Sequence, residues 1–236
     1  MKEKHNLDEY LKTHFIHRSN WLRAAVLGAN DGILSTASIA IGVAAASTTR
    51  EPIILATLAG LVAGALSMAA GEYVSVSSQT DIEKADIERE RQELEEMPEE
   101  ELQVLAQIYE NRGLKKETAL QVAEELTAHD ALAAHVRDEL GINEMSKANP
   151  IQAALASGAS FVFGGILPLL VVFLLPLKTM ELYIYASSII FLAILGAVSA
   201  KTGGAKIMNS VVRITFWGTI AMGITALIGY LFGINL

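Results

Sequence analysis

Long apolar segments dominate the chain, and a polar block separates the first two from the last three. Each apolar segment has about 20 residues or more, the length that a helix needs to cross a bilayer. The five segments cover residues 24–47, 53–77, 151–175, 182–200 and 210–233. The pattern therefore predicts an all-α integral membrane protein with five transmembrane helices.

The polar block consists mainly of strong helix formers. Pro98, Gly113 and Gly141 divide it into three helical stretches, because proline breaks a helix and glycine commonly ends one. No turn signal occurs between Ser75 and Glu96, so the first stretch is expected to continue the second membrane helix. The predicted parts are an amphipathic N-terminal lead, two transmembrane helices, an inserted three-helix domain and three further transmembrane helices, at residues 1–23, 24–77, 78–149 and 150–236.

Composition agrees with a membrane protein and locates its charge. Of the 236 residues, 52% are hydrophobic and the mean hydropathy is +0.38. The chain has no cysteine, which excludes disulfides and thiolate metal sites. Residues 81–147 carry 19 of the 26 acidic and 8 of the 18 basic residues, a local charge of −11. A block this acidic excludes nucleic acid as its partner.

Basic residues in the short loops predict the orientation in the membrane. The N-terminal lead and the connection between the fourth and fifth segments are rich in lysine and arginine, whereas the other membrane loops carry one basic residue each. This distribution places the N-terminus and the acidic block in the cytoplasm and the C-terminus outside. Since the lead shows no targeting signal, we expect a prokaryotic cytoplasmic membrane, or a vacuolar membrane if the protein is eukaryotic.

Two carboxylates lie inside the first and second apolar segments. Asp31 and Glu72 both fall in the cytoplasmic halves of their segments, on stripes of small and polar residues. Acids at such depth usually line a pathway or bind a partner, and no lysine or arginine lies within the membrane to neutralise them. They therefore need a proton or a metal ion. Met68, one turn before Glu72, favours a transition metal, because a thioether is a poor ligand for Mg²⁺ or Ca²⁺. The alternative is that Met68 only packs and Glu72 is protonated.

Several quoted stretches carry a resemblance to a known family. The runs "GANDGILSTASIAIGVAAAS", "SMAAGEYVSVSSQTDIEKADIERE" and "NPIQAALASGASFVFGGILPLL" resemble the vacuolar iron transporter family. The resemblance implies a homodimer with five spans per subunit that exports Fe²⁺ from the cytoplasm in exchange for protons, with Mn²⁺ as a second substrate. By position, Asp31, Met68 and Glu72 match the pathway residues of the first and second spans.

The resemblance also implies that the inserted domain binds metal through glutamates. Glu90 and Glu93 match the pair expected on the first helix of this domain. The next helix offers Glu99, Glu100 and Glu101 in succession, of which Glu100 or Glu101 is the expected ligand. The third helix offers His135 and Glu139, four residues apart on one face. The alternative for these residues is an ordinary solvated surface, in which His135 is simply exposed.

Other function classes fit the sequence less well. A ferritin-type di-iron oxidase requires Glu-x-x-His motifs on two helices, and none occurs here. ATP-driven pumping requires a phosphate-binding GxxxxGK[ST] loop, which is also missing. We therefore expect a transporter and not an enzyme, with metal ions and protons as its partners and no resident cofactor. A membrane-anchored metal sensor or iron-binding protein without transport remains the alternative.

Overall fold

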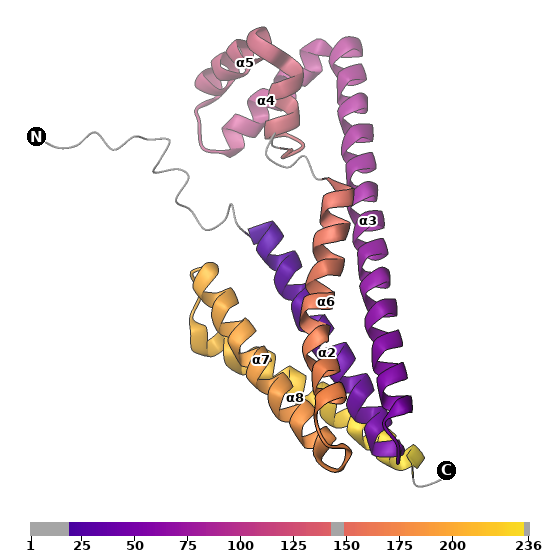
Figure 1. The fold of residues 1–236 in the computed structure, drawn as a ribbon. Coiled ribbons are helices and arrows are strands. Elements are labelled where there is room, and N and C mark those ends of the chain that lie inside the picture. Colours follow the sequence, from indigo (N-terminus) through magenta and orange to yellow (C-terminus); the bar gives the residue numbers. More distant parts are fainter. Residues whose placement is uncertain (1–18, 143–148, 234–236) are drawn as a thin grey trace, which may run out of the picture. The chain divides into compact units, whose positions relative to one another are not determined.

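The computed structural model describes residues 19–142 and 149–233, and the regular secondary structure of this part of the chain is entirely helical (Figure 1). The expected amphipathic character of the N-terminal lead falls largely on residues 1–18, which lie outside the described residues. The α-helices are α2 (Ser19–Ala46), α3 (Glu51–Glu96), α4 (Pro98–Asn111), α5 (Lys116–Asp138), α6 (Pro150–Leu174), α7 (Met180–Thr202) and α8 (Ile207–Gly233), with a short 3-10 helix, η3 (Leu177–Thr179), before α7.

Five of these helices are long and apolar enough to cross a membrane, as the sequence predicts. They contain the five apolar segments and are α2, α3, α6, α7 and α8. The expected continuity between Ser75 and Glu96 is also confirmed, because α3 runs without interruption from the apolar segment into the polar block and ends at Glu96. At 1.5 Å per residue, its 46 residues span about 70 Å, more than twice the hydrocarbon thickness of a bilayer.

The chain divides into two compact units, residues 1–73 with 151–236 and residues 74–150. In the first unit, glycines bring α2 and α6 into backbone contact. A Cβ atom at Gly32 would overlap the carbonyl oxygen of Phe161, and one at Gly164 would overlap that of Ala29. Only glycine leaves room for so close an approach, which is the usual way in which membrane helices pack.

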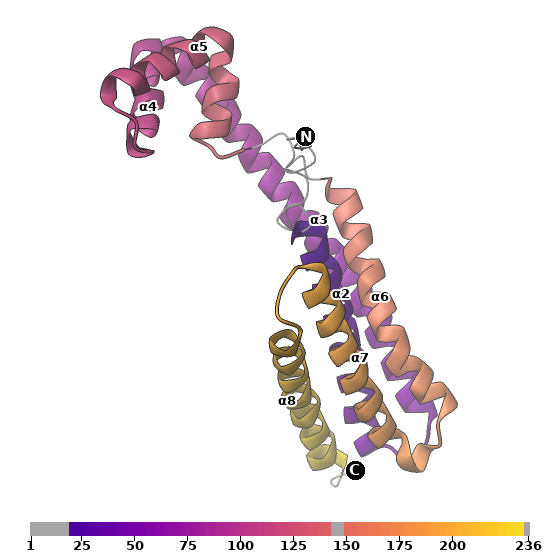
Figure 2. The same ribbon diagram turned by 90° about the vertical axis from the view of Figure 1, so that its left-hand side faces the viewer.

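Helices α7 and α8 complete the first unit by packing against α2 and against each other (Figure 2). Apolar side chains of α2, among them Ile33 and Ile41, form one buried cluster with Leu192 of α7 and Met222 of α8. Figure 1 and Figure 2 both show these three helices side by side. In a membrane, where lipid tails are as apolar as these side chains, such a cluster stabilises the unit through close van der Waals packing.

Arg50 joins the turn between α2 and α3 to the end of α6. Its guanidinium donates hydrogen bonds to the carbonyl oxygens of Phe173 and Leu175, both at 2.6 Å. The last carbonyl groups of a helix have no intrahelical donor, so a cation at this end satisfies them and opposes the helix dipole.

The second unit contains the end of α3 together with α4 and α5. Helices α4 and α5 pack through a small apolar core, which includes Leu105, Ala123 and Ala134. Gly113, with φ +100°, makes the turn between them, since this backbone conformation is unfavourable for residues with a Cβ atom. Inside α5, Asp130 has an extended backbone (φ −164°, ψ 95°) that bends the helix.

Candidate metal centre

Four side chains of the second unit converge on one point. Glu90 comes from α3, Glu101 from the first turn of α4, and His135 and Glu139 from the end of α5. Each offers one ligand atom, and these atoms all lie within 4.8 Å of one another. No other group of three or more histidine and acidic side chains in the described part of the chain is as compact.

His135 lies at the centre of this cluster. Its Nδ1 is 2.9 Å from Oε1 of Glu90, 2.9 Å from Oε2 of Glu139 and 3.7 Å from Oε2 of Glu101. His135 and Glu90 are almost completely buried, with 0% and 1% of their side chains exposed, and Glu139 is about one-third exposed. The alternative in which His135 is a surface residue is therefore wrong.

The hydrogen bonding of the cluster is incomplete. The Nδ1 of His135 is hydrogen-bonded to Glu139, and the geometry leaves Oε1 of Glu90 without a hydrogen-bond donor despite its short distance to the ring. The Nε2 atom of His135 is also buried and has no partner among the described residues. A buried acceptor without a donor costs about 1–3 kcal/mol, so a cation or a proton at this point would stabilise the fold.

The electrostatics of the carboxyl groups agree with this incomplete bonding. Burial raises the pKa of Glu90 above its ordinary value, and the nearby charge of Glu139 raises it further. Burial and Glu139 likewise raise the pKa of Glu101. A divalent cation would relieve the repulsion between the carboxylates. One imidazole nitrogen with three carboxylate oxygens suits Fe²⁺, Mn²⁺ and other first-row divalent ions.

The structure does not bring every expected ligand of this domain to the cluster. Glu93 lies outside it, 37% of its side chain is exposed, and its nearest charged partner is Arg89 at 3.8 Å. Of the two alternatives on α4, Glu101 enters the cluster while Glu100 is exposed at the surface.

The expected pathway residues of the first unit are half-buried and do not form such a cluster with further acids or histidines in the described chain. Asp31 accepts a hydrogen bond from Oγ of Ser35 at 2.5 Å. Met68 packs against the apolar cluster around Phe161, so within one chain it contributes packing. Glu72 lies one turn further along α3.

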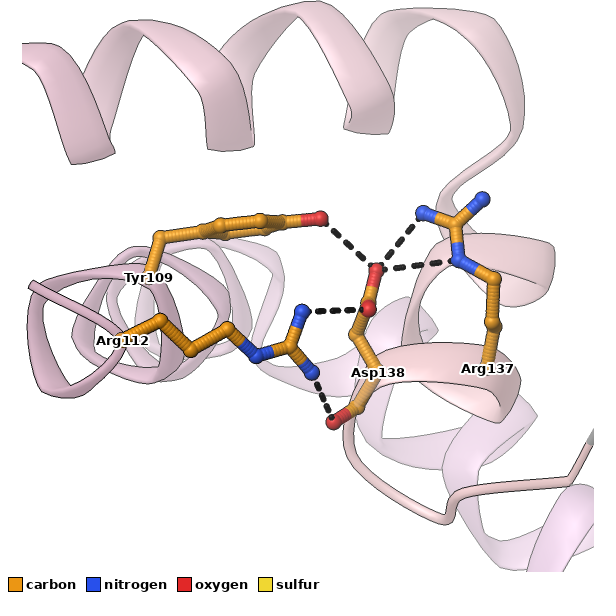
Figure 3. Close-up of polar contacts among 4 residues, drawn as sticks. All are labelled: Tyr109, Arg112, Arg137 and Asp138. Carbon is orange, nitrogen blue, oxygen red and sulfur yellow. Dashed lines mark hydrogen bonds and ion pairs between the residues drawn. The ribbon is translucent and has the colours of Figure 1, made fainter. Parts of the chain in front are cut away.

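A second polar group next to the cluster has no counterpart among the predicted sites. The carboxylate of Asp138 accepts hydrogen bonds from the hydroxyl of Tyr109 (2.8 Å) and from the guanidinium groups of Arg112 (2.7 Å) and Arg137 (2.6 Å), as Figure 3 shows. Burial alone would raise the pKa of Asp138, but these hydrogen bonds lower it to about 2. Asp138 is therefore charged at neutral pH and anchors the end of α5 to the end of α4.

Comparison with known proteins covers nearly the whole chain. Residues 22–230 match the sequence model of the VIT family. The chain is 48% identical over 214 residues to a vacuolar iron transporter of Acanthamoeba castellanii, which covers 90% of this chain and 79% of that protein. It is 38% identical over 223 residues to vacuolar iron transporter homolog 1 of Oryza sativa subsp. japonica, covering 94% of this chain and 78% of that protein. It is 36% identical over 217 residues to vacuolar iron transporter homolog 2 of Arabidopsis thaliana, covering 90% and 86%. The matched regions include the helices that carry the metal cluster.

Proposed function

The chain belongs to the VIT family, and from that premise we propose that it exports divalent transition metal ions, Fe²⁺ and also Mn²⁺, from the cytoplasm in exchange for protons. Relatives named vacuolar iron transporters support metal transport as the general activity. The observation that carries the proposal is the buried cluster of Glu90, Glu101, His135 and Glu139, in which a carboxylate oxygen has no donor.

The inserted unit collects the ion. Glu90, Glu101 and Glu139 supply anionic oxygens and His135 supplies a nitrogen, so the four together neutralise and partly replace the hydration shell of one divalent ion. The half-buried Glu93 and the exposed Glu100 raise the local concentration of cations by their charge and loose coordination. Because the domain is strongly acidic, this attraction weakens at high ionic strength.

Asp31, Met68 and Glu72 line the transport pathway in the membrane, contributed by both subunits of a homodimer. In each subunit the two carboxylates lie in separate helices with no lysine or arginine at the same depth. Release on the far side follows from protonation of the same carboxylates, since a protonated acid is a weak ligand. One set of groups therefore binds metal and protons in competition, which is the physical basis of exchange.

The proposed orientation in the membrane follows from the basic residues in the short loops. Residues 24–77 and 150–236 form the membrane part, and residues 78–149 form the metal-binding domain on the cytoplasmic side together with the N-terminus. The C-terminus lies outside. The membrane is a prokaryotic cytoplasmic membrane, or a vacuolar membrane in a eukaryotic cell.

Uptake of Fe²⁺ into sealed proteoliposomes with an acidic interior, under anaerobic conditions, tests the proposal. Wild-type protein should show uptake that depends on the pH gradient, and Asp31→Asn and Glu72→Gln should abolish it. Glu51→Gln is a matched control, because Glu51 is an exposed acid at the start of the same helix as Glu72. Wild-type protein that binds iron but transports none would support a sensor without transport, and normal transport by Asp31→Asn would refute the pathway.

A further inference from the structure

Two of the four cluster residues lie on a separate short segment of α5. The bend at Asp130 divides α5, and the part after it, residues 131–139, carries His135 and Glu139. The Oδ1 of Asp130 accepts a hydrogen bond from the backbone N–H of Ala133 at 3.0 Å. This is the geometry of an N-cap, which begins a helix by satisfying one of its first free N–H groups. Residues 131–139, called here the ligand arm, therefore have their own helix start.

The other end of the ligand arm is fixed to α4. Asp138, with only 8% of its side chain exposed, is held by Tyr109 of α4, by Arg112 directly after α4 and by its neighbour Arg137 (Figure 3). Arg112 also donates to the backbone carbonyl of Asp138 at 3.2 Å, and its guanidinium lies 5.1 Å from the centre of the Tyr109 ring. Several charge-assisted bonds thus meet on one residue, and such bonds are stronger than neutral ones.

The carboxylates of the cluster repel one another, and the contacts of Asp130 and Asp138 oppose this repulsion. Glu90, Glu101 and Glu139 place carboxyl groups within 4.8 Å of one another around His135, so without a cation their charged forms repel. The ligand arm is only about two turns long, and its one fully buried apolar side chain is the small Ala134, so apolar contacts alone hold it weakly against this repulsion. Fixing both of its ends keeps the ligand atoms together.

We propose that Asp130 and Asp138 are positioning residues of the metal centre, which fix the two ends of the ligand arm and so hold His135 and Glu139 beside Glu90 and Glu101 before the ion binds. The inference rests on the proposed function, in that the cluster binds metal. Neither aspartate contacts the ion, since neither belongs to the group of converging ligand atoms. Residues that orient metal ligands typically contribute 10–100-fold to affinity.

Two variants with opposite charge changes separate positioning from simple electrostatics. If Asp138 acted on the ion through its negative charge, Asp138→Asn would weaken binding, and Arg112→Gln would strengthen it by removing a nearby positive charge. If the Asp138 anchor positions the ligand arm, both variants weaken binding, by about tenfold. Arg91→Gln and Asp86→Asn are matched controls, since both residues are exposed and form only local ion pairs on α3.

The N-cap provides a test by conservative rescue. Asp130→Ala removes the acceptor for Ala133 and should weaken binding, whereas Asp130→Asn and Asp130→Ser retain an acceptor that is among the preferred N-caps. Wild-type affinity in the Asn and Ser variants, together with reduced affinity in the Ala variant, identifies the capping hydrogen bond as the cause. Equal loss in all three variants would instead show that the negative charge of Asp130 matters, and would overturn its assignment as a cap.

The experiment is a Co²⁺ titration of the full-length protein in detergent, followed by visible absorption. The signal of this centre is defined as the difference from His135→Ala, which separates it from any membrane site. We expect Asp138→Asn, Arg112→Gln and Asp130→Ala to weaken binding about tenfold and to change the absorption spectrum, with unchanged helix content by circular dichroism. A wild-type affinity and spectrum in Asp138→Asn and Arg112→Gln would overturn the inference while leaving the metal centre intact. A wild-type titration in His135→Ala would refute the metal centre itself.

Discussion

Glu90→Gln tests whether the carboxylates of the cluster destabilise the metal-free domain. Burial and the charge of Glu139 raise the pKa of Glu90 above its ordinary value of 4.5, so the folded domain binds its proton more tightly than the unfolded chain does. Its contribution to stability is therefore fully present below pH 4.5 and is lost as the pH rises through the raised pKa. At neutral pH the metal-free wild type should be destabilised, and the glutamine variant should not.

The expected magnitude follows from the linkage between proton affinity and stability. Each tenfold increase in the proton affinity of Glu90 on folding corresponds to about 1.4 kcal/mol of stability lost at high pH. The same free energy changes the rate of amide hydrogen exchange about tenfold when exchange occurs through local opening. With EDTA present, Glu90→Gln should slow exchange in α4 and α5 at pH 7.5, by tenfold for each tenfold by which folding raises the proton affinity of Glu90, and much less at pH 5. Added Co²⁺ should protect the wild type and leave the variant unprotected.

Hydrogen exchange with mass spectrometry measures these effects on the full-length protein. Glu95→Gln is the matched control, because Glu95 is an exposed glutamate on the same helix. It removes the same charge without changing a buried group, so its exchange should equal that of the wild type. If exchange in Glu90→Gln at pH 7.5 were as fast as in the wild type or faster, the idea that the buried carboxylate of Glu90 destabilises the metal-free domain would be refuted.

Three further predictions concern packing and anchoring. Gly32→Ala should lower the free energy of unfolding of the detergent-solubilised protein, measured by thermal denaturation, by about 1–3 kcal/mol, because its Cβ atom would overlap α6. Gly223→Ala is the control, since its Cβ atom meets open space and should leave this free energy equal or higher. Equal losses in the two variants would contradict the backbone contact. Arg50→Gln should cost about 1 kcal/mol in the same assay by removing two hydrogen bonds at the end of α6, with the exposed Lys178→Gln as its neutral control. The stabilisation by Asp138, whose pKa is about 2, should persist above pH 4 and disappear as the pH falls towards 2. Near-ultraviolet circular dichroism of tyrosine should follow this loss in the wild type, and Asp138→Asn should show no such transition.

The hydrophobic pattern predicts the helices well because each helix depends on neighbouring residues in the sequence. Pro98 ends the long α3 and begins α4, and Gly113 and Gly141, both with positive φ, follow the next two helices. The segment lengths alone predict the five membrane helices, since a bilayer requires about 20 apolar residues whatever their tertiary contacts.

The resemblance to the family leaves the choice between Glu100 and Glu101 open, although the helical spacing of α4 distinguishes them. Glu101 precedes the buried Leu105 by four residues, so both lie on the face of α4 that packs inward. Glu100 bears the same relation to the exposed Val104. The 3.6-residue period of α4 therefore favours Glu101 as the cluster residue.

The remaining contacts depend on which helices meet, and the sequence does not contain that information locally. Asp138 and Tyr109 are 29 residues apart, and no spacing rule connects them. The bend at Asp130 has a partial signal, since aspartate is a preferred N-cap and an apolar stretch follows it. Helix propensity over the surrounding residues nevertheless favours a continuous helix, which the structure does not show at Asp130.

The glycine contact between α2 and α6 has a consequence for the movement of water. Where the backbones of two helices touch, as at Gly32 and Gly164, no space remains for a water molecule, and still less for a hydrated ion. Asp31 and Ser35 lie on α2 about 100° and 60° around the helix from Gly32, both in the same direction. The contact at Gly32 and Gly164 therefore closes the side of α2 that faces α6 to water, and a hydrated ion can approach Asp31 only from the rest of the surface of α2.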